Sequence, residues 1–238
     1  MGYYTYRSAY NPFLFFDWTW LLLIAGFVIT LIVQMVMRST AKKYSEVPSA
    51  AGLTGAQAAQ KLLFSAGIYD VTVVRISGSL TDHYNPSDKT LGLSDTSYGS
   101  SSLTALGVAA HECGHAIQHA TGYVPLRIRT ALVPVVNISS TASWLLFFLG
   151  IIASFQPMVL AGIILFSVAI VFQFITLPVE VDASSRALKL LENTGTLRAD
   201  EVKGSRKVLR AAAMTYVASL AASILQLLRL LSIANRRR

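Results

Sequence analysis

Residues 144–163 read "WLLFFLGIIASFQPMVLAGI", and two apolar runs meet in this stretch at a polar break before Pro157. The stretch lies in the middle of an apolar block, 131–177, that contains no charged residue. Splitting the block at the break gives runs over 133–153 and 158–177, each long enough to cross a hydrocarbon core of about 30 Å. The block therefore predicts a tight transmembrane hairpin whose two ends return to the same side of a membrane.

The composition of the whole chain agrees with a membrane protein. Of its 238 residues, 53% are hydrophobic and 13% are charged, with a mean hydropathy of +0.53, whereas a soluble domain averages about 25% charged residues. The formal net charge is +8, and the basic residues flank apolar segments, where they would face anionic headgroups. The chain lacks the basic and aromatic pattern of a nucleic-acid surface, which excludes that class of partner. A single cysteine, Cys113, rules out an intrachain disulfide.

Apolar runs near the two ends of the chain predict further spans. Residues 18–37 would form an anchor, because this run is too long for the apolar region of a cleaved signal peptide. Lysine and arginine are more frequent after the run than before it, so the positive-inside rule places the N-terminus outside and residue 38 onward in the cytoplasm. The run 211–234 is favoured as a fourth span over a helix that lies on the membrane.

The polar region 38–130 carries the signals of short helices and strands. A helix is predicted from an N-cap at Thr54 to a stop at Gly67. Three strand-like runs follow, and a small antiparallel sheet is expected from them. The runs are 69–76, 80–84 and 90–94. Serines 100–102 then open another helix, which extends to about Thr121.

This last helix contains "HECGH", a metal-binding pattern. His111 and His115 are four residues apart, so their rings project from one helix face about 6 Å apart along the axis. That separation suits two corners of a tetrahedral zinc site. Glu112 would lie beside the open coordination position, where its carboxylate can take a proton from zinc-bound water and pass it to a leaving amine. The pattern predicts a hydrolytic zinc site that needs a third protein ligand from elsewhere.

Three residues compete for the place of the third ligand. His119 lies about 12 Å along the helix axis from His111, so a straight helix cannot bring it to an ion that His111 and His115 share. His83 is remote in sequence but can reach the site from a strand. Glu180 is the best candidate. The hairpin enters the membrane shortly after the motif helix and comes out on the same side just before this glutamate, which brings the two segments together.

A later motif completes a resemblance to a known family. HExxH, then a transmembrane hairpin, then "EVDAS" resembles the M48-type membrane peptidases of the HtpX and Ste24 kind. In that family the glutamate of an E-x-x-A-D motif is the third zinc ligand. Glu180 and Ala183 match the motif, whereas Ser184 stands where the family has aspartate and Asp182 lies two residues early.

Longer stretches make a closer resemblance. They read "LTGAQAAQKLLFSAGIYDVTV", "LTDHYNPSDKTLGLSD", "AAHECGHAIQHATGYVPLRIRTALVPVVN" and "TLPVEVDASSRAL". These stretches are similar to the YugP-type membrane zinc metallopeptidases, over almost the whole chain from about residue 50. The resemblance implies a bacterial membrane metallopeptidase.

Other side chains are candidates for a place near the metal. The run "LTDHY" is expected either to be an edge strand that holds a peptide substrate, with His83 or Tyr84 stabilising an oxyanion, or to be an ordinary strand beside a turn. Tyr216 is another candidate oxyanion donor or an interfacial aromatic residue. Asp182 and Ser184 either orient a zinc histidine or are solvated helix positions.

Together these patterns predict an α+β membrane protein, mainly helical, with about four transmembrane helices and a small antiparallel sheet in a cytoplasm-facing, zincin-like catalytic region. From the N-terminus the predicted segments are an anchor with its leader (1–37), the cytoplasmic catalytic region (38–130), the hairpin (131–177), a cytoplasmic helix with the third ligand (178–210) and a membrane helix with a basic tail (211–238).

The expected function is hydrolysis of peptide bonds in membrane or membrane-proximal proteins by a zinc metalloendopeptidase. The metal, Zn2+, would be bound by His111, His115 and Glu180, and Glu112 would activate water. The alternative is a non-catalytic scaffold or adaptor with a structural metal site. The expected location is the bacterial cell membrane, with the lipid bilayer and protein or peptide substrates as partners. No pattern indicates a homo-oligomer or a regulatory membrane-protein partner.

Overall fold

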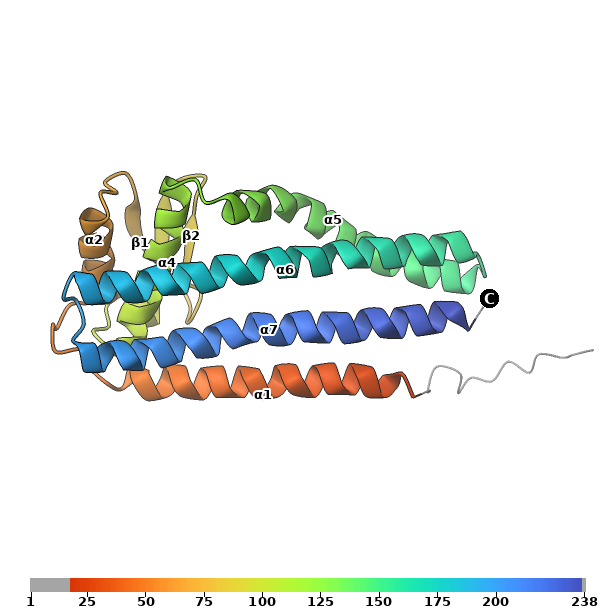
Figure 1. The fold of residues 1–238 in the computed structure, drawn as a ribbon, viewed down its shortest axis with the longest axis horizontal. Helices are drawn as coiled ribbons and strands as arrows, with labels where there is room; N and C mark the ends of the chain where they lie inside the picture. Colours follow the sequence, from red (N-terminus) through yellow and green to blue (C-terminus); the bar gives the residue numbers. More distant parts are fainter. Residues whose placement is uncertain (1–17, 237–238) are drawn as a thin grey trace, which may run out of the picture.

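The computed structural model describes residues 18–236, and within that range the chain is mainly helical. Four long helices run side by side, and a small α/β part covers one end of them (Figure 1). In chain order the elements are α1 (Trp20–Ser45), α2 (Gly55–Ser65), β1 (Thr72–Ile76), β2 (His83–Asn85), β3 (Thr90–Ser94), α3 (Asp95–Tyr98), α4 (Leu103–Ala120), α5 (Val124–Ile152), α6 (Gln156–Asn193) and α7 (Ala199–Asn235). The predicted fold class is confirmed, while the expectation for the N-terminal residues 1–17 lies outside the described residues.

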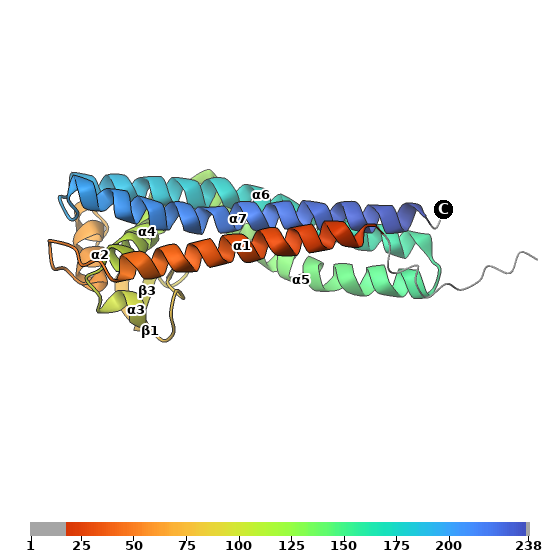
Figure 2. The same cartoon turned by 90° about the horizontal axis from the view of Figure 1, so that it is seen from below.

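The four long helices α1, α5, α6 and α7 have the length and apolar character to cross a membrane. α1 packs on α7, α7 on α6 and α6 on α5, and the helices follow one another in that order in Figure 1. In Figure 2 the far part of α5 lies below α1, so the four helices do not lie in one plane. Many large apolar side chains on these helices are exposed, as expected where lipid surrounds a helix. The α5–α6 turn lies at the end of the bundle remote from the α/β part (Figure 1). The N-terminal end of α1 and the C-terminal end of α7 lie at that same end.

The predicted hairpin is present as α5 and α6, which meet at the expected polar break. At the turn Ser154 has a φ of 53°, and the Phe155 N–H donates to the Gly150 carbonyl at 2.9 Å. This bond closes the C-terminal end of α5. A Cβ at Gly162 would lie 2.8 Å from the Phe147 nitrogen, so the two helices approach closely only because glycine is present.

The helix that was expected to begin at Pro178 is instead the continuation of α6, which runs unbroken to Asn193. Proline removes one N–H from the helix ladder, and neighbouring helices can compensate for that loss in a membrane protein. Here α4, α5 and α7 all pack along α6, and this packing keeps the helix continuous across the proline. The expected boundary at 178 is therefore wrong as a helix start, and Glu180 lies inside a helix of 38 residues.

The prediction of an antiparallel sheet is wrong in one pairing. β3 lies between the other two strands, and β2 runs antiparallel to it while β1 runs parallel. The physical reason lies in the segment between β1 and β2, which does not turn back tightly. The Gly78 N–H donates to Asp95 Oδ2 at 3.2 Å, and the Ser94 N–H donates to Asp82 Oδ1 at 2.8 Å. These bonds carry the chain past the end of β3 to its other edge, which makes β2 an edge strand.

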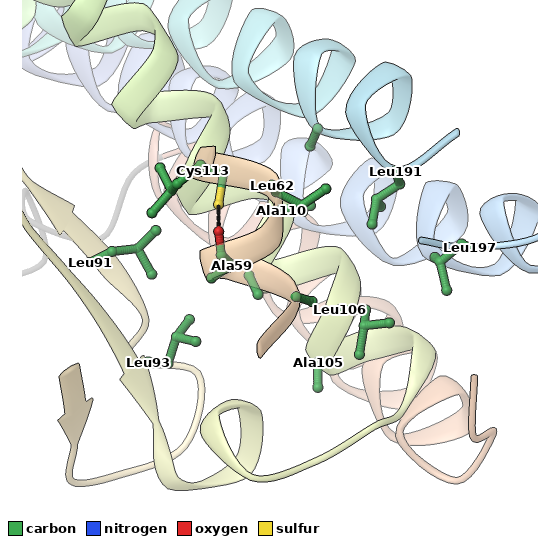
Figure 3. Close-up of a cluster of buried hydrophobic side chains, with 14 of the residues drawn as sticks. Ala59, Leu62, Leu91, Leu93, Ala105, Leu106, Ala110, Cys113, Leu191 and Leu197 are labelled. Carbon is green, nitrogen blue, oxygen red and sulfur yellow. Dashed lines mark hydrogen bonds between the residues drawn. The ribbon is translucent and has the colours of Figure 1, made fainter. Parts of the chain in front are cut away.

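α4 is the central element of the α/β part and is buried on most sides. Ser102 caps its N-terminus by accepting from the Ala105 N–H at 3.2 Å, as the serine run predicted. Leucines from α2, β3 and α6 pack around it, together with its own Leu106 (Figure 3). Cys113 lies in this core, and its thiol donates to the Ala59 carbonyl oxygen at 3.6 Å. Burial raises the pKa of that thiol. The helix that carries the metal-binding motif is thus fixed inside a core.

Candidate metal centre and active site

Three side chains from two helices converge where α4 packs on α6. His111, His115 and Glu180 each place one ligand atom so that the three atoms lie within 4.8 Å of one another. The Nε2 atoms of His111 and His115 lie 3.2 and 3.6 Å from Glu180 Oε2. Within residues 18–236 no other such group of histidine, cysteine and carboxylate side chains occurs. The structure therefore brings together the three residues that the sequence pattern selected as ligands.

A glycine inside the motif determines how closely the two helices approach. A Cβ at Gly114 would lie 2.4 Å from the Ala183 carbonyl oxygen, so only a residue without a side chain permits this contact. Gly114 immediately precedes His115, and Ala183 lies one turn after Glu180. The contact therefore sets the distance between the ligands of α4 and the ligand of α6. Sequence reasoning missed this role, although a glycine inside a predicted helix is a signal for it.

A glutamine on α4 orients the ring of His115. Gln118 Oε1 lies 3.0 Å from His115 Nδ1. The amide nitrogen of Gln118 donates to the Val179 carbonyl and to Asp182 Oδ2, both at 2.8 Å, so the amide oxygen is the atom left for the imidazole. With its proton on Nδ1, His115 turns the lone pair of Nε2 towards Glu180. Asp182 acts on the histidine through this fully buried glutamine, which sequence reasoning did not select.

A serine on α6 contacts the other histidine. Ser184 Oγ lies 3.1 Å from His111 Nδ1. Asp182 does not share this place, because it accepts from Gln118 and from Arg186 Nε, the latter at 2.6 Å. The serine thus stands beside His111 at the position where the related motif has aspartate. Each histidine has one hydrogen-bonded nitrogen and one nitrogen directed at the carboxylate.

This arrangement of donors fits a zinc ion. Two imidazole nitrogens and one carboxylate oxygen, with hydrogen-bonded supports behind them, are the donors of a catalytic zinc site that keeps one open position. Burial lowers the pKa of His115, but the neighbouring carboxylates of Glu180 and Glu112 outweigh that effect and raise the pKa above its usual value. The electrostatic environment therefore favours a cation between the three side chains.

Arg129 on α5 contacts the same carboxylate from the other side. Its Nη1 lies 3.1 Å from Glu180 Oε1, while Glu180 Oε2 faces the histidines. The two charged residues that bound the uncharged hairpin block thus form an ion pair, which ties the hairpin to the candidate metal centre. Sequence reasoning used Arg129 only to mark the end of the block. The signal for this pair was that the first charges on either side of the hairpin have opposite sign.

Glu112 is buried, with 7% of its surface exposed, and it faces two cavities that meet at the candidate centre. The smaller cavity has a volume of about 230 Å³ and the larger cavity about 390 Å³. Both are lined by the same central residues, which are Asp82, His111, Glu112, Glu180 and Tyr216. The two cavities are therefore the arms of one cleft that passes over Glu112 and the ligand atoms.

The remaining candidates lie at different distances from the centre. His83 and Tyr84 on β2 line the larger cavity, whereas Tyr216 on α7 lines both cavities. His83 Nδ1 lies 3.0 Å from the Thr81 carbonyl, and this histidine is not part of the converging group. The hydroxyl of Tyr84 lies 2.8 Å from His119 Nδ1, and His119 is not part of the group either. Of the three competitors for the third ligand, Glu180 is the one that lies with His111 and His115 in the converging group.

Comparison with known proteins agrees with this geometry. Residues 19–235 match the model of a family described as "Putative neutral zinc metallopeptidase", and the chain belongs to that family. The chain is also 43% identical over 212 residues to "Putative membrane protease YugP" of Bacillus subtilis (strain 168), a match that covers 89% of this chain and 94% of that protein. The resemblance to YugP-type membrane zinc peptidases is therefore confirmed. No solved structure matches the chain.

Proposed function

We propose that this protein is a zinc metalloendopeptidase of the bacterial cell membrane that hydrolyses peptide bonds of membrane or membrane-proximal proteins. The observation that supports it best is the convergence of His111, His115 and Glu180 beside a buried glutamate that faces a cleft. A structural metal site, as in a scaffold or adaptor, does not require a carboxylate in that place. The family and the membrane relative support the same class of activity.

His111, His115 and Glu180 would hold the metal, each through the atom described above. When bound there, zinc supplies a Lewis acid that polarises a substrate carbonyl and lowers the pKa of water towards 7. Gln118 and Ser184 keep the imidazole rings in place, so that little reorganisation is needed when the ion binds.

The other side chains of the cleft move the proton and receive the substrate. The Glu112 carboxylate takes a proton from the attacking water and then gives it to the nitrogen of the leaving amine. The Tyr216 hydroxyl and the exposed His83 ring border the same space, and they would donate hydrogen bonds to the carbonyl oxygen as it gains negative charge.

β2 offers a way to hold an extended peptide. It is one of the two edge strands of the sheet, and its residues line the larger cavity beside the candidate centre. The unpaired backbone groups of an edge strand can pair with a substrate strand, which fixes the peptide by main-chain bonds and without a strong sequence requirement.

Glu112→Gln tests the proposed activity. In detergent-purified protein the variant should keep the zinc content of the wild type and lose peptide cleavage by at least about a hundredfold, because an amide cannot take the proton. Glu192→Gln, an exposed position on α6, is the matched control and should cleave like the wild type. Unchanged cleavage in Glu112→Gln would refute the assigned base. If the wild type and Glu112→Gln both contain zinc and neither cleaves peptides, the result would favour the scaffold.

We further propose that the α/β part faces the cytoplasm. The support is the excess of lysine and arginine in 38–130 and 186–210 over the other loops. Cys113 is buried, so single exposed cysteines can be labelled without interference from it. An impermeant thiol reagent on intact cells should label Ala153→Cys at the α5–α6 turn, and should label Ser79→Cys only after permeabilisation. The reverse pattern would contradict this orientation.

A further inference from the structure

The smaller cavity differs from the larger one in its lining. Away from Glu112 it is walled by apolar side chains, with Met37 from α1, Val108 from α4, and Val208 and Ala212 from α7. Its charged lining residues other than histidine are all acidic, and no lysine or arginine of the described chain lines it. An aliphatic or aromatic group is therefore favoured in this arm, and a negatively charged group is disfavoured.

The larger cavity is more polar along its walls. Asn85 and Ser87 near β2, and Arg129 and Thr130 on α5, line it together with Pro134. The two arms of the cleft are thus chemically different although they share the residues around Glu112.

An extended peptide meets these two arms with successive residues. In an extended chain neighbouring side chains point to opposite sides. A peptide that places its scissile bond over Glu112 therefore directs the side chain on one side of that bond into the smaller cavity, and the next side chain towards the larger cavity. The smaller cavity, at about 230 Å³, has room for a large aliphatic or aromatic side chain.

The smaller cavity also lies at a defined level of the membrane helices. Met37 is the last residue of the apolar run of α1, and Ala212 is at the start of the apolar run of α7. On the hairpin, Glu180 lies just beyond the uncharged block. All three mark the place where a helix leaves the hydrocarbon, so the cleft opens at the membrane surface rather than deep in the bilayer.

We propose that the smaller cavity binds a large aliphatic or aromatic side chain directly beside the scissile bond. The substrates would then be segments in which a membrane-spanning stretch of a protein leaves the bilayer, since apolar residues meet extended backbone there. This inference rests on the proposed peptidase function, and it adds the substrate class and the residues that select it.

Binding to the inactive enzyme tests this inference separately from catalysis. The full chain with Glu112→Gln, loaded with zinc in detergent, is titrated against short fluorescein-labelled peptides of serine, threonine and glycine with one central leucine, alanine or glutamate. The leucine peptide should bind about tenfold or more tightly than the alanine peptide, and the glutamate peptide should bind most weakly. Adding Ala212→Phe, which fills the cavity, should abolish the preference for leucine.

Two further variants keep the test decisive. Met214→Phe places the same phenylalanine side chain on an exposed position of α7 that lines neither cavity, and it should leave the preference unchanged. Val208→Ala enlarges the cavity and should shift the preference towards a tryptophan peptide, even if Ala212→Phe fails to fold. Equal binding of the leucine and alanine peptides to the Glu112→Gln protein would overturn the inference. So would an equal loss of preference in Met214→Phe. Either result would leave peptide cleavage by the wild type, and with it the proposed function, unaffected.

Discussion

The α/β end of the molecule, where the α/β part meets the long helices, is held together differently from the far end at the α5–α6 turn. At the α/β end one continuous core, mainly of leucines and alanines, encloses α4. At the far end α5, α6 and α7 share a small core while large apolar side chains remain exposed; its members are Phe147, Ile151, Val159, Ile163, Leu230 and Ala234. The α/β end has a large packed core of its own, whereas the far end leaves much of its apolar surface exposed. The candidate centre lies where these two kinds of surroundings meet.

Both ends nevertheless use the same device, a glycine that lets two helices touch. Gly114 brings α4 onto α6, and Gly162 brings α5 onto α6. Only the first contact sets distances between candidate ligands. The comparison therefore predicts that equal disturbances at the two ends have unequal effects on metal binding.

The largest difference is expected between Gly114→Ala and Gly162→Ala. Each added methyl group meets backbone atoms below 3.0 Å and forces the helices apart, which costs about 1–3 kcal/mol of stability. Gly114→Ala should also weaken zinc binding by more than about a hundredfold, because the ligands of α4 move away from Glu180. Chelator competition and thermal unfolding on both variants measure the two effects. A similar loss of zinc affinity in Gly162→Ala would remove the distinction between the two ends.

A smaller effect is expected from the glutamine that orients His115. Gln118→Ala should weaken zinc binding about 10–100-fold, because the imidazole loses its hydrogen bond at Nδ1. Gln173→Ala is the matched control at membrane depth, where Gln173 Nε2 donates to Ser223 Oγ at 3.0 Å. This control should leave zinc affinity unchanged in the same chelator titration. Equal affinities for the two variants would show that Gln118 does not support the metal site.

The smallest effect is expected from the arginine of the hairpin. Arg129→Met should weaken zinc binding by less than about tenfold, because Glu180 loses a partner at Oε1 but keeps Oε2 towards the histidines. The control is Arg229→Met, since Arg229 lies over the Trp20 ring at 4.5 Å near the far end. Its zinc affinity should equal that of the wild type. An Arg129→Met protein with wild-type affinity would show that the ion pair serves only to hold the hairpin.

Much of this site follows from local sequence pattern. The spacing of His111 and His115 fixes one helix face, and the break before Pro157 fixes a hairpin that returns to the same side. Together they place Glu180, rather than His83 or His119, beside the two histidines, and the three side chains converge in the structure. This placement follows from the sequence because helix periodicity and membrane thickness leave few alternatives. The role of Glu180 as a metal ligand stays a prediction.

The residues that sequence reasoning missed depend on contacts between distant segments. Gln118 and Arg129 become part of the site only because α6 and α5 pack beside α4, and neither position has a spacing that marks it. The predicted helix start at 178 is wrong because packing on three neighbouring helices keeps α6 continuous through Pro178. The parallel pairing of β1 and β3 likewise depends on side-chain bonds of Asp82 and Asp95 that strand propensity does not describe.

The most direct test of the central claim is the zinc content of Glu180→Ala. The claim is that α4 and α6 together form the metal centre, with this glutamate as the third ligand. Glu192→Ala, which removes an exposed carboxylate from the same helix, is the control. Metal analysis after dialysis against a weak chelator should find stoichiometric zinc in the wild type and in Glu192→Ala, and little zinc in Glu180→Ala. Stoichiometric zinc in Glu180→Ala would contradict the account and return His83 and His119 to consideration.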